Sequence, residues 1–255
     1  MKSLLQQLFN RSRSSEVPTS EGRGEAPDAV HSVEEVFTGI YTTNRWGGEA
    51  GEFCSGRGSS QASIVEPYVA TISDLADRLG FRGTAFVDLG CGDFQVGRRL
   101  LPLCSNYVGV DVVPALVARN QRDFGDERTR FEHLDIISQS LPEGDVCFVR
   151  QVFQHLSNVQ IASVLEKLEA FRWVFVTEHY PHLNASIVPN LDQKAGDGTR
   201  IRRNSGVYLS QPPFSLPEDS LSPVLEVAGG GRWRRRRAGV IRTVLYEPEA
   251  GHSEG

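Results

Sequence analysis

The sequence predicts an α/β fold with a doubly wound, seven-stranded sheet that is mostly parallel and ends in an antiparallel hairpin. Short apolar segments of strand character alternate with segments of helical periodicity through the middle of the chain, and this alternation is typical of a parallel sheet with helices on both faces. A glycine-rich turn follows the first strand, as in folds that bind a ligand at the carboxyl edge of the sheet. Near the end, segments 222–227 and 239–246 flank GGGRWRRRRA and indicate the hairpin.

The composition fits one globular domain. The chain has 255 residues, of which 39% are hydrophobic and 23% charged, and its net charge is −5. These values are ordinary for a soluble protein and give no general argument for binding to nucleic acid or to an anionic membrane. No apolar run approaches the ~18–20 residues that span a bilayer. The four cysteines are scattered, which indicates reduced thiols in a cytoplasmic protein rather than a disulfide framework or a zinc site.

Both ends of the chain differ in composition from the middle. Residues 11–30 are rich in Ser, Gly, Pro, Glu and Arg, and the last residues are similar. Such segments bury too little apolar surface to offset the entropy of ordering. We therefore expect disordered tails at 1–30 and 249–255, around one domain at 31–248.

Within that domain, each element follows from a local pattern. Apolar residues from Val33 to Tyr41 recur at helical spacing and predict a helix that begins after Ser32. Further helices are expected at 64–79, ended by Gly80, and at 96–103, 114–122 and 159–171. Strands are expected at 84–89, 107–110, 131–134, 145–149 and 173–177. The stretch 181–217 is long for a connection between strands, and we expect it to form a lid over a substrate.

The most informative segment is AFVDLGCGDFQVGRRL, residues 85–100. A strand that ends in glycines before a helix lets backbone N–H groups approach a ligand closely. The carboxylate of Asp88, two places before Gly90, would repel a pyrophosphate, whereas it suits a ligand that carries an ammonium or sulfonium group. The dinucleotide fingerprint also requires a third glycine at position 95, which is Gln95.

This segment resembles motif I of the class I S-adenosylmethionine (SAM)-dependent methyltransferases, Asp/Glu-x-Gly-x-Gly-x-Gly, with Asp93 at the place of the third glycine. The resemblance implies a Rossmann-like fold with SAM as cofactor. Asp111 ends YVGVD and can accept hydrogen bonds from both hydroxyls of a ribose, in NAD as well as in SAM. Asp135 ends FEHLD, and the methyltransferase pattern implies that it accepts from the adenine amino group while the Ile136 N–H meets a ring nitrogen. Alternatively, these aspartates are ordinary turn formers at strand ends.

A second resemblance lies upstream of motif I. The residues from Ile40 to Gly47 and from Ser55 to Ser59 are similar to the N-terminal segment of a bacterial subgroup of these enzymes. It implies a loop that folds over SAM, with Trp46 shielding the site and the amides of 55–60 meeting the amino-acid end. The alternative is a surface loop whose tryptophan packs on the domain. The residues expected to hold SAM are thus Trp46, Ser59, Asp88, Gly90, Gly92, Asp93, Asp111, Asp135, Ile136 and Arg150.

Candidates for catalysis follow the fourth and fifth strands. Methyl transfer from a sulfonium is an in-line displacement that needs alignment, exclusion of water and, for a protonated nucleophile, a base. The fifth strand ends in TEHYP, which places His179 and Glu178 at the mouth of the site as first and second candidates for that base. His155 is either a base or a helix-packing histidine. Arg150 and Gln151 follow the fourth strand and supply no carboxylate there, so we expect no metal.

Two groups of arginines have alternative interpretations. Arg200, Arg202 and Arg203 lie in the expected lid, where they either pair with an acidic substrate or form a solvated face. The run from Arg232 to Arg237 has the charge of a nucleic-acid patch. Because the chain is acidic overall and the run lies in a hairpin, a solvated hairpin is favoured and nucleic acid is not an expected partner.

Together, the patterns predict a metal-independent, cytoplasmic SAM-dependent methyltransferase without membrane attachment. Its acceptor would be an oxygen, or a nitrogen, of a small molecule such as a sugar or a secondary metabolite. Two other classes stay open: a non-catalytic SAM-binding or RNA-associated protein, and an NAD-linked oxidoreductase. The latter is disfavoured by Asp88, by the glycine spacing and by the absence of a Tyr-x-x-x-Lys pair in the sequence.

Overall fold

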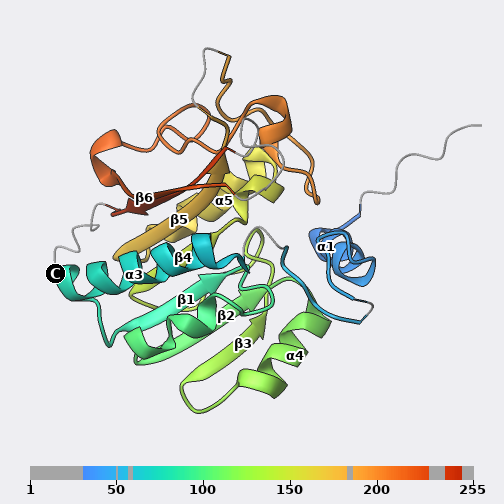
Figure 1. Cartoon of the computed structure of the whole chain (residues 1–255), viewed down its shortest axis with the longest axis vertical. Helices are drawn as coiled ribbons and strands as arrows, with labels where there is room; N and C mark the ends of the chain where they lie inside the picture. The colour runs from blue at the N-terminus through green and yellow to red at the C-terminus, as the bar shows by residue number, and fades with distance from the viewer. Residues whose placement is uncertain (1–30, 50, 57–59, 183–185, 230–238, 249–255) are drawn as a thin grey trace, which may run out of the picture. The chain divides into compact units, whose positions relative to one another are not determined.

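A computed structural model describes residues 31–49, 51–56, 60–182, 186–229 and 239–248 (Figure 1). All of them belong to one compact unit, His31–Gly255, which is separate from Met1–Val30. The two expected tails and the run from Arg232 to Arg237 lie outside the described residues. No helix in the described ranges is long and apolar enough to cross a membrane.

The sheet has seven strands in the order β3-β2-β1-β4-β5-β7-β6, which confirms the expected fold class. The parallel strands are β1 (Ala85–Leu89), β2 (Asn106–Asp111), β3 (Thr129–His133), β4 (Val146–Arg150) and β5 (Trp173–Tyr180). β7 (Val240–Tyr246) runs antiparallel between β5 and β6 (Leu221–Ala228). The two strands of the expected C-terminal hairpin therefore pair with each other as predicted, and β7 joins them to the edge of the parallel part of the sheet.

The helices begin and end at recognisable signals. α1 (Val33–Thr42) and α5 (Asn158–Leu168) each start with a capping box, in which Ser32 and Ser157 accept a hydrogen bond from the third residue of the helix. α3 (Ala62–Leu79) ends at Gly80, which has the left-handed conformation that favours glycine. α4 (Pro114–Phe124) has proline in its first turn, where the missing N–H costs nothing.

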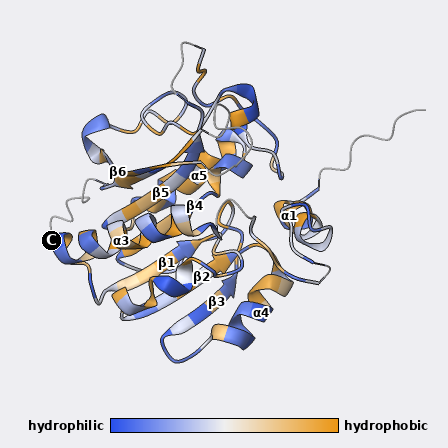
Figure 2. Cartoon of the chain, in the orientation of Figure 1, coloured by the Kyte–Doolittle hydropathy of each residue, from blue (hydrophilic) through white to orange (hydrophobic). Residues whose placement is uncertain are grey.

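The hydrophobic core has two parts, one on each face of the sheet. Side chains alternate between the faces along a strand, so that Phe86 of β1 packs with α3 while Val87 packs with α5 and α1. Figure 2 shows hydrophobic residues concentrated in the middle of the sheet, between these layers. The central strands are thus fully buried, and the only polar side chains that they present to a ligand lie at their ends.

Most elements differ from those expected by one to three residues at an end, as in α5, which ends at Leu168 rather than at 171. Three of the differences have a local cause. The segment 96–103 forms two 3₁₀ turns, Gly97–Arg99 and Leu101–Leu103, because a proline at position 102 would clash with the preceding turn of an α-helix. β3 begins and ends earlier than predicted, and Asp135 lies two residues beyond it. β5 continues three residues further than predicted, to Tyr180, because β7 pairs with it from Val174 to Tyr180.

Candidate active site

A cavity of about 290 Å³ opens at the carboxyl ends of β1, β2 and β4. β1 lies between β2 and β4 in the sheet, so the chain leaves β1 towards one side and later returns on the other. This change of direction creates the crevice in which open α/β proteins bind ligands. The volume is close to the lower end of the range for small-molecule pockets.

The turn after β1 forms the floor of the cavity. Gly90 and Gly92 have positive φ angles of 71° and 55°, which L-residues rarely adopt. A Cβ atom on Gly90 would lie 2.5 Å from Val152 Cγ2, and one on Gly92 would collide with Ser55 Oγ. Both positions therefore require glycine for backbone conformation and for close approach of neighbouring segments.

Asp88 and Arg150 place opposite charges beside this turn. Asp88 is 8% exposed and lines the cavity, and its Oδ2 accepts a hydrogen bond from the Tyr107 hydroxyl. Burial raises the pKa of Asp88 to about 6, against the opposing effects of Tyr107 and Arg150. The Arg150 guanidinium lies 5.3 Å from the ring centroid of Tyr68, and burial lowers its pKa. Asp88 of β1 and Arg150 of β4 thus place a carboxylate and a guanidinium at the ends of two neighbouring strands.

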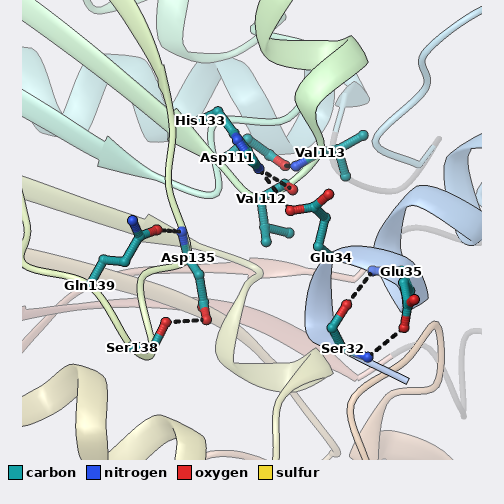
Figure 3. A network of polar contacts seen from close by, with 10 residues as sticks. All are labelled: Ser32, Glu34, Glu35, Asp111, Val112, Val113, His133, Asp135, Ser138 and Gln139. Atoms are coloured by element: carbon teal, nitrogen blue, oxygen red, sulfur yellow. Dashed lines mark hydrogen bonds and ion pairs between the residues drawn. The ribbon is translucent and has the colours of Figure 1, made fainter. Parts of the chain in front are cut away.

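Asp111 presents a second carboxylate at the end of β2. Its Oδ2 accepts from the Gly92 N–H and its Oδ1 from the Val113 N–H, each at 3.1 Å; Figure 3 shows the Val113 bond. Burial raises the pKa of Asp111 to about 6, while the backbone donors lower it. Because a carboxylate oxygen can accept more than one hydrogen bond, both oxygens keep acceptor capacity for a ligand in the cavity.

Asp135 presents a third carboxylate from the loop after β3. Its Oδ1 accepts from the Ile137 N–H at 2.9 Å and its Oδ2 from the Ser138 hydroxyl at 2.6 Å. Its own N–H donates to Gln139 Oε1 at 2.7 Å. Figure 3 shows the contacts with Ser138 and Gln139. Together the three contacts fix the orientation of the Asp135 side chain.

Lys167 of α5 holds the same loop through its backbone. The ammonium group donates to the carbonyl oxygens of Ile136, Ile137 and Gln139. The N–H of Ile136 lies at the cavity and makes no hydrogen bond within the described part of the chain. The loop thus offers one carboxylate and one N–H donor side by side.

α1 covers the cavity near this loop. His133 Nε2 lies 3.1 Å from Glu34 Oε2 of α1 and 3.2 Å from the Val112 carbonyl oxygen, as Figure 3 shows. Val33 and Phe37 on the same helix line the cavity. The polar contact between His133 and Glu34 and the apolar residues that line the cavity hold the helix at the edge of the site.

Aromatic rings form one wall of the cavity. Trp46 lies 5.2 Å from Tyr41, 6.0 Å from Phe37 and 5.0 Å from His155, measured between ring centroids. All four residues line the cavity. Trp46 is therefore placed at the site, where the sequence led us to expect it.

The glycine-rich segment after Trp46 is tied to the turn after β1. The Ser55 N–H donates to Asp93 Oδ2 at 3.0 Å, and the Asp93 N–H donates to Ser55 Oγ at 2.8 Å. The Tyr41 hydroxyl lies 3.0 Å from the same Ser55 oxygen. The Ser55 amide, which we expected to meet the ligand, bonds to Asp93 instead. Ser59 lies outside the described residues.

Glu178 and His179 do not stand at the mouth of the cavity, contrary to the prediction. β5 continues through both of them, and neither lines the cavity. The Glu178 carboxylate is 0% exposed and accepts from the N–H groups of Phe153 and Gln154 at 2.8 and 3.0 Å. Burial raises its pKa to about 8. Glu178 thus orders the turn after β4 from inside the protein.

His155 does line the cavity, through a turn that follows β4. Its Nδ1 lies 3.0 Å from the Gly196 carbonyl oxygen, which fixes Nδ1 as the protonated nitrogen, and its Nε2 lies 3.2 Å from the Gln154 side-chain nitrogen. Burial lowers the pKa of His155 to about 4. The ring is neutral at pH 7, and both of its nitrogens have partners.

The three arginines of the segment 181–217 have different environments. Arg200 is 1% exposed and donates to the carbonyl oxygens of Leu191, Phe153 and Leu156. It is neither solvated nor directed at a ligand, so both interpretations of Arg200 are wrong. Arg202 is exposed, and Arg203 donates to Asp192 O and Gln193 Oε1.

Sequence reasoning missed Tyr107 and Lys167. Tyr107 shares a face of the sheet with Asp88 only because of the register between β1 and β2, which the sequence does not reveal. Lys167 has the ordinary appearance of a basic residue in the last turn of a helix. Among the residues that the structure describes, no group of three or more His, Cys, Asp or Glu side chains could hold a metal ion.

Residues 87–171 match the family model described as a methyltransferase domain. This stretch of the chain is similar to a methyltransferase domain. The match includes the turn after β1 and the ends of β2 and β3, and it confirms the resemblance to class I SAM-dependent methyltransferases that motif I indicated. No match was found among curated proteins.

Solved structures with the methyltransferase fold are similar over most of this chain. The N-methyltransferase NodS from Bradyrhizobium japonicum WM9, in complex with S-adenosyl-L-homocysteine, is 17% identical, with a TM-score of 0.52 over 76% of this chain and 91% of that chain. Magnesium protoporphyrin IX methyltransferase from Synechocystis PCC 6803 is 12% identical, with a TM-score of 0.54 over 86% and 100%. The 1,6-didemethyltoxoflavin-N1-methyltransferase of Burkholderia thailandensis is 16% identical, with a TM-score of 0.51 over 84% and 87%. At these identities the likeness establishes the fold.

Proposed function

We propose that the protein is a SAM-dependent methyltransferase that moves a methyl group to an oxygen or nitrogen of a small molecule, without a metal. One observation carries the proposal. Asp88, Asp111 and Asp135 come from three different strands or the loops that follow them, and all three line one cavity beside the glycine turn.

The residues present fit SAM as a cofactor. Its ammonium and sulfonium groups are cations, its ribose has two hydroxyl donors, and its adenine has an amino donor. The cavity offers buried carboxylates for these groups and the Ile136 N–H for a ring nitrogen. A nucleotide pyrophosphate would instead bring negative charge against Asp88, which disfavours an NAD-linked oxidoreductase.

SAM supplies an activated methyl group, and the chain supplies placement and an apolar wall. Phe37, Tyr41 and Trp46 line the cavity, and apolar side chains that displace water around the reacting groups strengthen the electrostatic contacts there. Asp111 and Asp135 orient the ligand through side chains that are themselves fixed by backbone donors. Orientation of this kind is a large part of the acceleration of a displacement reaction.

Binding of SAM is the first test. Calorimetric titration of the purified protein with SAM at pH 8 is expected to give a micromolar Kd, and NAD is expected to give no heat of binding. Formation of S-adenosylhomocysteine with an acceptor library then separates an enzyme from a non-catalytic SAM-binding protein. Binding of NAD in place of SAM, or of neither, would overturn the proposal at its first step.

We also propose that His155 positions the acceptor and is not the base. Its neutral ring at pH 7, with both nitrogens engaged, suits packing against Trp46 and anchoring of Gly196. His155→Asn keeps a donor towards Gly196 and is expected to raise the KM for the acceptor several-fold, with less than a tenfold decrease in kcat. Steady-state kinetics from pH 6 to 9 measure this split. A decrease in kcat by two orders of magnitude or more, at constant KM, would assign His155 as the base.

The setting we propose is the cytoplasm. All four cysteines are free, and Cys147 is fully buried, as is typical of proteins in a reducing compartment. The acceptor reaches the cavity between the aromatic wall and the segment that carries Asp197 and Thr199, both of which line it.

A further inference from the structure

The two oxygens of the Asp88 carboxylate have different surroundings. Oδ2 accepts the hydrogen bond from the Tyr107 hydroxyl. Oδ1 makes no hydrogen bond with any residue in the described ranges, and the side chain lines the cavity. One oxygen is thus held from within the protein, and the other remains for a ligand.

Tyr107 itself has little freedom. It is 1% exposed, and its ring centroid lies 5.2 Å from that of Phe94 and 6.4 Å from that of Phe131. A Cβ atom on Gly97 would collide with the Tyr107 hydroxyl oxygen, so only glycine at position 97 leaves room for the hydroxyl. The tyrosine and the glycine together define one position for the donor.

We propose that Tyr107 is a positioning residue for the cofactor site, whose hydroxyl holds one oxygen of Asp88 so that the other faces the cavity as a charged acceptor for the cationic part of SAM. The inference rests on the proposed function for the identity of the ligand. The contact between Tyr107 and Asp88 joins two side chains of the protein, so it can be tested independently of SAM binding.

The hydrogen bond from Tyr107 affects whether Asp88 is ionised, because opposing influences act on this carboxyl group. Arg150 favours the ionised form of Asp88, whereas Asp111 and burial oppose it, and together they place the pKa at about 6. Because Tyr107 lowers this pKa, loss of its hydroxyl raises it. At pH 6.5–7, a larger fraction of Asp88 is then protonated and unable to pair with a cation, and at pH 9 the carboxyl is ionised again. The other titratable groups that face Asp88 or Tyr107 are Tyr68, Cys91 and Cys147.

The experiment is a pH series of SAM binding with matched variants. Calorimetry from pH 5.5 to 9 is expected to show that Tyr107→Phe weakens binding about tenfold at pH 6.5, and that the difference shrinks at least threefold by pH 9. Tyr180→Phe is the control, because it removes a buried hydroxyl that donates to Val207 O at 2.7 Å outside the cavity. Its binding curve is expected to follow that of the native protein at every pH. A Tyr107→Phe curve parallel to that of the control would overturn the proposal.

A second measurement needs no cofactor. Carbon-13 NMR of the aspartate carboxyl groups in the unliganded protein, with the Asp88 signal assigned through Asp88→Asn, follows the titration of Asp88 directly. Its midpoint is expected to rise by at least half a pH unit in Tyr107→Phe. If that variant does not fold, Gly97→Ala displaces the hydroxyl and is expected to shift the midpoint in the same direction. An unchanged midpoint contradicts the role of Tyr107, whereas failure of the native protein to bind SAM contradicts only the proposed function.

Discussion

Replacing Asp111 by alanine is expected to weaken SAM binding at least 100-fold at pH 8. At this pH the carboxylate is ionised, since its pKa is about 6. Each hydrogen bond from a ribose hydroxyl to a charged acceptor contributes about 1.5–3 kcal/mol, so loss of two corresponds to about 3 kcal/mol or more, and every 1.4 kcal/mol is about tenfold in Kd. The N–H groups of Gly92 and Val113 also lose their acceptor, which loosens the turn that meets the ligand.

The matched control is Asp111→Asn, which keeps the shape and one acceptor oxygen. It is expected to bind SAM more tightly than the alanine variant and more weakly than the native protein. Calorimetry gives all three affinities, and circular dichroism verifies that the variants are folded. Affinity of the alanine variant within threefold of the native value would remove Asp111 from the cofactor site.

Replacing Arg200 by methionine is expected to lower the free energy of unfolding by about 3–5 kcal/mol, the magnitude of breaking a buried charged network from one side. The guanidinium donates to three carbonyl oxygens and to Asn158 Oδ1. Methionine would remove all four hydrogen bonds, and of these acceptors the Phe153 oxygen would keep the Leu156 N–H as a donor. Its positive charge also favours the ionised form of Glu178. Urea unfolding, followed by circular dichroism, measures the change.

Arg202 provides the comparison within the same turn, because its side chain is exposed. Arg202→Ala is expected to change the free energy of unfolding by no more than about 0.5 kcal/mol, as is usual for surface positions. If Arg200→Met instead left stability unchanged and raised the KM for an anionic acceptor, Arg200 would be a substrate residue after all.

The placement of the carboxylates and glycines at one cavity could be predicted from sequence because these residues belong to short local patterns. Strand–turn–helix units place Asp88, Gly90, Gly92 and Asp111 at one edge by topology alone. The end of β3 was predicted one residue too late, but the predicted position of Asp135 is still correct, because the loop after the strand lies at the same edge of the sheet.

The catalytic side could not be predicted in the same way, since it depends on pairing between distant segments. Glu178 and His179 were expected at a strand end, but antiparallel pairing with β7 extends β5 through them. Arg200 has the sequence context of a surface arginine, and only the folded segment 181–217 brings it beneath the turn after β4. Long-range register of this kind has no local signal in a single sequence.

The residues that line the cavity come from inside and from outside the stretch that matches a methyltransferase domain. The stretch that matches a methyltransferase domain, residues 87–171, contributes the glycine turn and most of the carboxylates. Trp46 and Asp197, which also line the cavity, lie on either side of that stretch in the sequence. If the proposed function holds, exchange of the two flanking segments, which are joined at the surface by the ion pair of Arg45 with Asp197 at 3.4 Å, would alter part of the cavity wall and leave residues 87–171 as they are.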